Sequence, residues 1–224
     1  MMNKGFFITG TDTAVGKTSF SVALIHHLQS QGNSVSALKP VASGCEKLEG
    51  IWKNDDALKL LQALNAAPQY ETVNPVALPD AIAPHLAAKK QNIELKAQDI
   101  FQSCQSVLNQ QNDYCIVEGA GGWLVPLNNK ETMADLAILF NFPVVIVVSM
   151  KLGCMNHCLL TVESIKKSGL KIAGWVANVF DPEMEKLQEN IATVEGLLTA
   201  PLLATMMQNN ESLIECRWMH FNDK

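Results

Sequence analysis

Near its start the chain carries the stretch Gly10-Thr11-Asp12-Thr13-Ala14-Val15-Gly16-Lys17-Thr18. An apolar run, residues 5–9, precedes it, and a segment with apolar residues at helical spacing follows it. A strand, a tight glycine loop and a helix in this order are the context of a phosphate-binding loop, whose backbone N–H groups converge on an anion at the positive end of the helix. The stretch therefore predicts a phosphate site in which Lys17 neutralises the outer phosphates and the Thr18 hydroxyl binds Mg²⁺.

The glycine spacing of this loop is unusual. Five residues separate Gly10 from Gly16, because the position that carries glycine in the common pattern is Thr11. This spacing disfavours a generic ATPase and favours a family whose loop is built in this way.

Composition limits the class of protein. The 224 residues are 48% hydrophobic, which suits one large core, and we expect a single domain over 1–224 with an uncertain tail after about residue 206. The net charge of −5 and the lack of a basic stripe give nucleic-acid binding little support. Six scattered cysteines suit reduced thiols, and the longest apolar run, 142–150, is too short for a bilayer. We therefore expect a soluble cytoplasmic protein with no membrane or nucleic-acid partner.

Apolar runs alternate with segments of helical spacing. The runs are continuous rather than alternating, which is typical of parallel strands covered on both faces. The sequence thus predicts an α/β fold with a doubly wound, mainly parallel sheet flanked by helices. We expect strands at 6–9, 35–38, 114–117, 144–148 and 172–179, and helices at 17–30, 56–65, 97–110, 133–140, 158–168 and 182–198. The segment 68–90 is the least regular, and such loops tend to be functional or mobile.

Polar residues follow the expected strands, where ligands bind in such sheets. They lie in the phosphate loop, in 39–44, in 118–122, in 151–156 and at Asn178. Several roles stay open from the residues alone. Glu118 either holds an acidic position near Mg²⁺ or is a solvated strand end. Lys39 either points outward or into the site.

Two further side-chain roles stay open as well. Asp55 and Asp56 suit helix capping, with metal binding as the second possibility. Ser43 either donates to a ligand or makes a turn.

Taken together, these segments resemble the dethiobiotin synthetase family. The unusual glycine spacing is that family's own variant. The matching residues run in family order: 10–18, 39–44 (Lys-Pro-Val-Ala-Ser-Gly), 54–58 (Asn-Asp-Asp-Ala-Leu), 73–75 (Val-Asn-Pro), 83–85 (Ala-Pro-His), 117–122 (Val-Glu-Gly-Ala-Gly-Gly), 151–157 (Lys-Leu-Gly-Cys-Met-Asn-His) and 173–178 (Ala-Gly-Trp-Val-Ala-Asn).

The resemblance implies an ATP- and Mg²⁺-dependent ring closure in biotin biosynthesis. The family joins 7,8-diaminononanoate and CO₂ into the cyclic urea of dethiobiotin and releases ADP and phosphate. One amine captures CO₂ as a carbamate, the γ-phosphoryl group of ATP activates it, and the second amine attacks its carbonyl carbon. Phosphoryl transfer of this kind depends on positioning and charge neutralisation.

The resemblance also implies the catalytic and metal-binding residues. Lys17 and Lys39 flank the carbamate and the γ-phosphate. Thr18, Asp56 and Glu118 hold Mg²⁺, and the match of residues 54–56 assigns this role to Asp56 rather than Asp55.

Further residues follow from the same resemblance. Ser43 and Lys39 meet the diamine, and Asn178 reads the adenine edge. The N–H groups around Gly153, Cys154 and Asn156 receive the substrate carboxylate from the other subunit, which implies a homodimer with the substrate site at its interface. The nucleotide-binding set is Thr13, Ala14, Val15, Gly16, Lys17, Thr18, Ser19, Asp56, Glu118, Gly119, Ala120, Gly121 and Asn178.

The chain departs from the family pattern at several places. Ala14 stands where the family often has Glu, and a backbone-built loop tolerates this. Residues 201–207 lack the Gly-x-x-Pro loop that many members use beside adenine, so nucleotide preference stays open. Some relatives place a partner-subunit Tyr on the substrate carboxylate, whereas the tyrosines here, Tyr70 and Tyr114, lie elsewhere.

Two other functions compete. A nucleotide-driven switch of the partitioning or metal-carrier type shares the expected fold, but such proteins usually place a second Lys early in the loop, and positions 11–15 contain none. An ATP-dependent cobyrinate amidase needs a glutaminase domain, for which this chain has no room.

Overall fold

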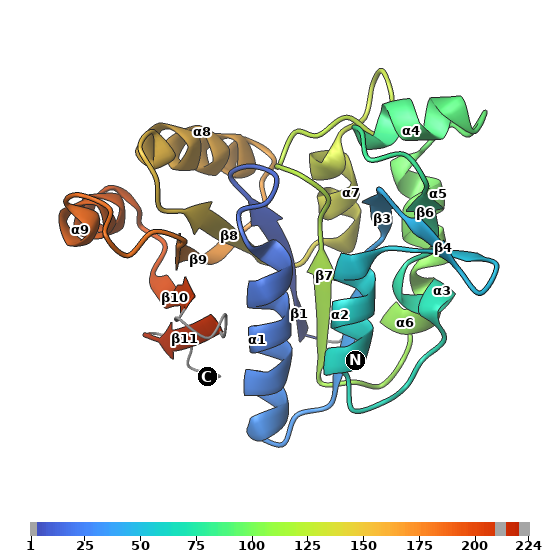
Figure 1. Ribbon diagram of the computed structural model, residues 1–224, viewed down its shortest axis with the longest axis horizontal. Helices are drawn as coiled ribbons and strands as arrows, with labels where there is room; N and C mark the ends of the chain where they lie inside the picture. Colours follow the sequence, from blue (N-terminus) through green and yellow to red (C-terminus); the bar gives the residue numbers. More distant parts are fainter. Residues whose placement is uncertain (1–3, 209–213, 220–224) are drawn as a thin grey trace.

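The computed structural model describes residues 4–208 and 214–219, and its centre is a seven-stranded sheet (Figure 1). The strand order is β11-β10-β9-β8-β1-β7-β2, with every neighbouring pair parallel except the antiparallel edge strand β11. The strands are β1 (Lys4–Gly10), β2 (Val35–Leu38), β7 (Tyr114–Glu118), β8 (Val144–Ser149), β9 (Ile172–Val179), β10 (Leu202–Gln208) and β11 (Ile214–Trp218). The expected α/β fold with a mainly parallel sheet is confirmed.

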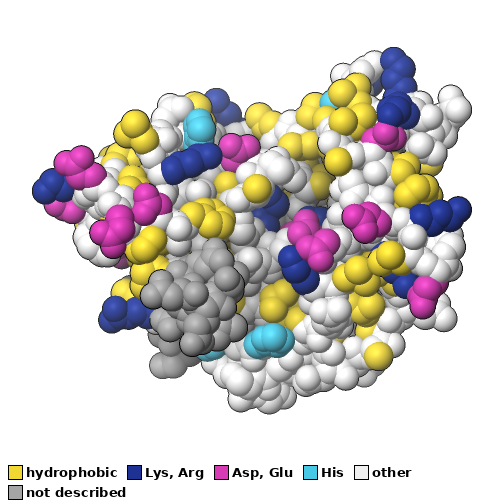
Figure 2. All heavy atoms as spheres, in the orientation of Figure 1, with side chains coloured by type: hydrophobic (Ala, Val, Ile, Leu, Met, Phe, Trp, Pro, Cys, Tyr) yellow, Lys and Arg dark blue, Asp and Glu magenta, His cyan; other side chains and the backbone are white. Residues whose placement is uncertain are grey.

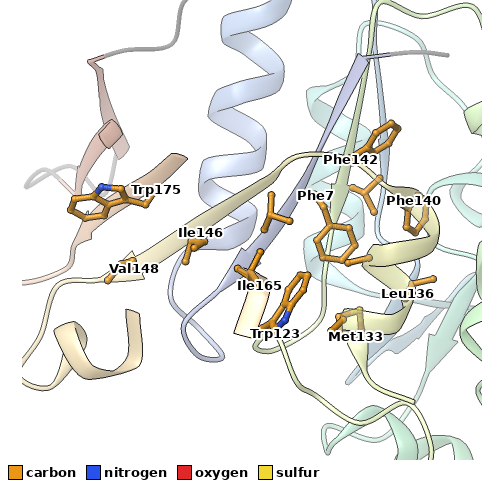
Figure 3. Close-up of a cluster of buried hydrophobic side chains, with 14 of the residues drawn as sticks. Phe7, Trp123, Met133, Leu136, Phe140, Phe142, Ile146, Val148, Ile165 and Trp175 are labelled. Carbon is orange, nitrogen blue, oxygen red and sulfur yellow. The ribbon is translucent and has the colours of Figure 1, made fainter. Parts of the chain in front are cut away.

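Helices cover both faces of the sheet. Successive residues of a strand point to opposite faces, so Phe7 packs into one core and Ile8 into the other. The Phe7 core holds α7 and α8 and is rich in aromatic side chains (Figure 3), whereas the Ile8 core holds α1 and α2. The helices are α1 (Lys17–Ser30), α2 (Asp55–Ala63), α3 (Tyr70–Val73), α4 (Pro84–Lys90), α5 (Ala97–Ser103), α6 (Gln105–Leu108), α7 (Met133–Phe140), α8 (Cys154–Lys167) and α9 (Leu187–Leu197).

Every expected strand is present, but several helix limits differ from expectation. The predicted helix 97–110 is interrupted at Cys104, which lies between α5 and α6. Helix α8 begins four residues early because Gly153, with φ of 90°, turns the chain directly into it. Helix α9 begins only at Leu187, since turns occupy the residues before it.

The segment 68–90 is more regular than the sequence predicted. It forms α3, α4 and the short strand β6 (Val76–Leu78), which pairs in parallel with β3 (Val41–Ser43). Beside it, β4 (Glu46–Leu48) and β5 (Ile51–Lys53) form an antiparallel hairpin. These strands are too short for a periodicity argument, and β3 and β6 are distant from each other in sequence.

The C-terminal part adds two strands that the sequence did not predict, β10 and β11. Residues 209–213, which follow β10, and 220–224 lie outside the described residues, as does part of the tail for which no structure was predicted. Within the described ranges, none of the helices combines the length and the apolar character that crossing a membrane requires.

Candidate active site

The predicted phosphate loop connects β1 to α1 and has the expected strand–loop–helix context. Gly16 has φ of 93°, and a Cβ there would lie 2.0 Å from Nδ2 of Asn178, so both its conformation and its surroundings require glycine. Ala14 also has a positive φ, 56°. A non-glycine residue in this region costs of order 1 kcal/mol, so the rest of the fold holds this loop in a demanding shape.

Lys17 is a buried cation at the start of α1. Its ammonium donates to the carbonyl of Asp12 over 3.1 Å, and it forms no ion pair among the described residues. Burial first, and then the positive charge of Lys39, lower the pKa of Lys17 to about 8 against the opposing attraction of Glu118 and Asp56. An anion bound beside Lys17 would stabilise its charged form and raise its pKa again.

Lys39 is buried as well, which settles the alternative left open by the sequence: it points inward. Its ammonium lies 2.6 Å from Oε1 of Glu118, 3.2 Å from Oδ2 of Asp56 and 3.2 Å from the carbonyl of Gly119. Burial alone would lower the pKa of Lys39, but the two carboxylates and their hydrogen bonds outweigh it, so the pKa lies above its ordinary value. Lys39 is therefore a charged group already neutralised by the protein.

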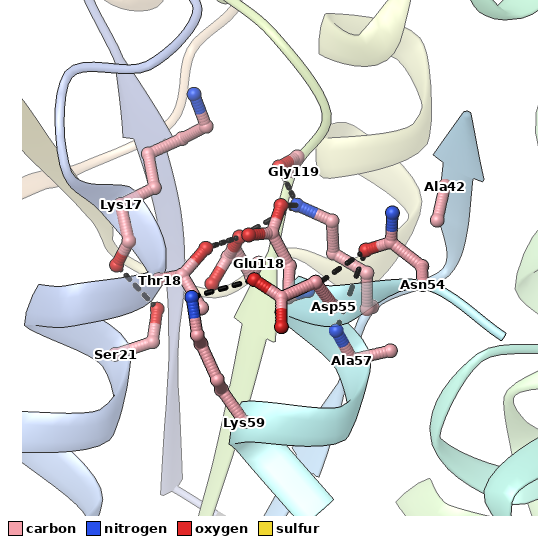
Figure 4. A network of polar contacts seen from close by, with 12 residues as sticks. Lys17, Thr18, Ser21, Ala42, Asn54, Asp55, Ala57, Lys59, Glu118 and Gly119 are labelled. Carbon is pink, nitrogen blue, oxygen red and sulfur yellow. Dashed lines mark hydrogen bonds and ion pairs between the residues drawn. The ribbon is translucent and has the colours of Figure 1, made fainter. Parts of the chain in front are cut away.

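The three predicted metal ligands converge at the same place. The Thr18 hydroxyl donates to Oε1 of Glu118 over 2.8 Å, and the two side chains point toward each other (Figure 4). Glu118 is fully buried, and its Oε2 has no hydrogen-bond partner among the described residues. An orphaned carboxylate oxygen, a second carboxylate and a hydroxyl are hard oxygen donors that fit Mg²⁺.

Asp56 and Asp55 separate into different roles at the start of α2. Asp56 contacts Lys39, whose charge and hydrogen bond, with that of the Thr18 hydroxyl, hold the pKa of Asp56 below its ordinary value in spite of partial burial. Asp55 is exposed and pairs with Lys59 over 2.6 Å. Neither carboxylate caps the helix: Oδ1 of Asn54 accepts the N–H groups of Asp56 and Ala57. The capping role predicted for the aspartates belongs to Asn54.

An open cavity of about 760 Å³ lies above these groups. Figure 2 shows basic and acidic side chains gathered around a hollow on this face. Its lining includes many predicted site residues: Thr13, Ala14, Gly16, Lys17, Thr18, Ser19, Lys39, Ser43, Asp56, Ala120 and Gly121.

Other predicted residues lie beneath or away from the cavity wall. Glu118 and Val15 are buried below it, and the Asn178 amide donates to the carbonyl of Val15 over 2.8 Å. Gly119 contacts the Lys39 ammonium only through its carbonyl. Within the described part of the chain, the lining does not include Gly153, Cys154 or Asn156. These three predicted residues therefore do not contribute to the cavity of their own chain.

The cavity also has lining residues that were not predicted as site residues. They are mostly apolar, with the polar side chains of Asn54 and Lys59 among them: Ala42, Asn54, Lys59, Ala81, Ile82, Ala83, Pro84, Val125, Pro126 and Phe180. Phe180 follows Asn178 at the end of β9, so the rule that ligands bind beyond strand ends could have found it. The lining residues 81–84 follow β6, a strand that the sequence did not predict.

The fold and the phosphate loop together define a P-loop nucleotide-binding α/β protein. Among solved structures, the chain is similar to the septum site-determining protein MinD from Pyrococcus horikoshii, complexed with Mg-ADP, with a TM-score of 0.58 and 17% identity over 93% of this chain and 82% of that one. It is likewise similar to a plasmid partition protein from Borrelia burgdorferi bound to AMPPNP, with a TM-score of 0.59 and 14% identity over 94% and 89%. At this identity the likeness concerns the fold alone.

Sequence relatives narrow the class to one family. A family model described as "AAA domain" matches residues 4–215. The chain is 49% identical to the ATP-dependent dethiobiotin synthetase BioD of Pseudomonas aeruginosa, covering 92% of this chain and 91% of the relative, and 51% identical to that of Cellvibrio japonicus, covering 92% and 90%. The chain belongs to the ATP-dependent dethiobiotin synthetase family.

Proposed function

We propose that this protein catalyses the ATP-dependent closure of 7,8-diaminononanoate and CO₂ to dethiobiotin, with release of ADP and phosphate. The observation that carries the proposal is one cavity that holds a phosphate loop and two buried lysines above a pair of carboxylates. A reaction that transfers the γ-phosphoryl group of a triphosphate to a carbamate brings two anions together, and this cavity holds the cationic groups that neutralise them.

ATP would bind along the phosphate loop. The loop N–H groups and Lys17 face the phosphates, as the lowered pKa of an unpaired, buried lysine favours. The Asn178 amide already donates to Val15 and keeps its carbonyl oxygen for an exocyclic amine of the base. Phe180, which lines the cavity and is 51% exposed, offers an apolar surface close to Asn178.

Thr18, Asp56 and Glu118 would hold Mg²⁺. When bound, the metal ion would supply charge neutralisation at the outer phosphates. Lys39 now contacts both carboxylates, so its ammonium marks the position where the protein's own charges favour a cation.

The diamine would lie along the apolar wall that begins beside Ser43. Ala81, Ile82 and Pro84 line this wall and suit an alkyl chain. The Ser43 hydroxyl is buried without a hydrogen-bond partner among the described residues, so it is available to a polar end of the substrate.

The chemistry then follows from charge and position. One amine adds to CO₂ and loses a proton, which gives the carbamate. A carbamate oxygen takes the γ-phosphoryl group, and ADP leaves. The second amine attacks the carbonyl carbon and loses a proton, the C–O bond to phosphate breaks with phosphate as the leaving group, and the urea ring closes. Lys17 and Lys39 would neutralise the carbamate and the transferred group throughout.

We further propose a cytoplasmic homodimer with one catalytic domain per chain, over 1–224. The segment that holds Gly153, Cys154 and Asn156 lies outside its own cavity, and Leu152 beside it is 98% exposed. Leu124 and Leu160 are exposed too. A second copy that covers these leucines would bring its N–H groups to the carboxylate end of the substrate. Light scattering of the pure protein tests the dimer.

The overall reaction is tested by ADP release from Mg-ATP with the diamine and bicarbonate, followed by mass detection of dethiobiotin. We expect ADP release to require both the diamine and bicarbonate. ADP release that ignores the diamine would contradict the proposal and would favour a nucleotide switch.

A further inference from the structure

A series of buried polar groups connects the backbone of Lys39 to the start of α2. Nδ2 of Asn74 donates to the Lys39 carbonyl over 2.6 Å, and the Tyr70 hydroxyl donates to Oδ1 of Asn74 over 2.7 Å. The same hydroxyl accepts the backbone N–H of Asn54 over 2.7 Å. We call Asn54, Tyr70 and Asn74 the polar bridge.

At its other end the polar bridge reaches two more cavity residues. Oδ1 of Asn54 accepts the N–H of Asp56 over 3.1 Å, and Nδ2 of Asn54 donates to the carbonyl of Ser43 over 3.2 Å. The bridge therefore joins Lys39, Ser43 and Asp56, which come from different elements of the fold.

All three members of the bridge are buried: Asn54 is 8% exposed, Tyr70 6% and Asn74 2%. Burial raises the pKa of Tyr70 to about 12, so the hydroxyl keeps the proton that it donates to Asn74. A buried network whose members are satisfied fixes the geometry around it, because breaking any one bond leaves a polar group without a partner.

We propose that Tyr70 and Asn74 are positioning residues that set the place of Lys39 relative to Asp56 in the reaction proposed above. Neither side chain is among the described residues that line the cavity, so both act through Lys39 and Asn54. A displacement of about 1 Å at a reacting group can lower the rate up to about a hundredfold. Residues that hold Lys39 in place can therefore affect kcat without contacting the substrate.

The test is Tyr70→Phe, which removes the bridging hydroxyl and keeps the ring. We expect kcat for dethiobiotin formation to fall about tenfold, with KM for ATP within about twofold of the unaltered protein, because the phosphate loop is untouched. In a Lys39→Ala background, the same change should give no further loss of kcat, because the residue through which it acts is gone.

The matched control is Ser36→Ala. It removes another buried hydroxyl, which donates to the carbonyl of Tyr114 over 3.3 Å, and we expect it to leave kcat unchanged. Urea unfolding without nucleotide measures how far each variant is destabilised. If Tyr70→Phe does not fold, Asn74→Ala interrupts the bridge at its next member and is judged by the same criteria.

Two results would overturn the inference: a kcat within twofold of the unaltered protein, or an equal loss of kcat with and without Lys39. The first would mean that the hydroxyl is dispensable, and the second that its effect is a general structural one. Since the inference rests on the proposed function, the unaltered protein is measured first. Absence of diamine-dependent ADP release there would refute the function itself, an outcome distinct from either of these.

Discussion

The two buried lysines of the cavity differ in what surrounds them. Lys17 sits at the phosphate loop with a backbone carbonyl as its hydrogen-bond partner, and its pKa is lowered to about 8, by burial first and then by Lys39. Lys39 sits between Glu118 and Asp56, and those carboxylates raise its pKa against the effect of burial.

This difference shows two ways to keep a cation inside a protein. Lys17 is held by the fold without a neutralising partner, so the protein pays a desolvation cost that an anionic ligand would remove. Lys39 is neutralised in advance, so it is stable without a ligand. We expect Lys17 to contribute mainly to nucleotide affinity and Lys39 mainly to catalysis and to the stability of the nucleotide-free protein.

The largest effect is expected for Lys39→Ala. Loss of a preorganised charge at the reacting group should lower kcat by about 10²- to 10³-fold, while the Kd for ATP changes less than about threefold. Steady-state kinetics and calorimetric titration measure the two quantities. Lys53→Ala, in the outlying hairpin, is the control. Weakened ATP binding with intact turnover would remove the distinction between the lysines.

The next effect concerns stability. Glu118→Gln leaves Lys39 buried with Asp56 as its remaining acidic partner, and we expect the free energy of unfolding without nucleotide to fall by about 3 kcal/mol. Adding Lys39→Met should restore much of the loss, because the interior then no longer holds an ammonium group that has lost the carboxylate of Glu118. Urea denaturation measures both variants, and simple additivity of the two changes would contradict the coupling.

Lys17→Ala should act mainly on binding. A charge-assisted contact to phosphate contributes about 1.5–3 kcal/mol, so we expect the Kd for ATP to rise about 10- to 100-fold. Unlike Glu118→Gln, this change should not destabilise the nucleotide-free protein, since it removes a buried charge that has no acidic partner among the described residues. Destabilisation equal to that of Glu118→Gln would show that the two surroundings are equivalent.

The smallest effect is expected at the rim. Phe180→Ala removes an exposed ring beside Asn178, and we expect the KM for ATP to rise about fivefold with kcat unchanged, as about 1 kcal/mol of stacking would give. Phe180→Leu retains apolar area without the aromatic face and separates stacking from burial. If the KM values for ATP, GTP and CTP are unaltered in Phe180→Ala, the nucleotide base does not bind against Phe180.

Local pattern was sufficient to predict the five parallel strands, the phosphate loop and the positions of Lys17 and Glu118 relative to strand ends. It failed where the chain is organised by distant partners. The segment 68–90 pairs β6 with β3 and supplies Tyr70 and Asn74, although its short elements have no periodicity of their own. Asn54 rather than an aspartate caps α2, since it directly precedes the helix, whereas Asp56 contacts Lys39 and Asp55 pairs with Lys59.

The parallel sheet, the phosphate loop and the family could be inferred from the amino-acid sequence alone, since hydrophobic periodicity and glycine spacing are local properties of the chain. The folded structure was needed to show that Lys39 points inward and that it shares Glu118 with Thr18. For Asp56, which the family resemblance had already favoured over Asp55, it added the contact with Lys39. This is because the charge state and direction of a buried side chain depend on the groups around it, and these come from segments that meet only when the sheet forms.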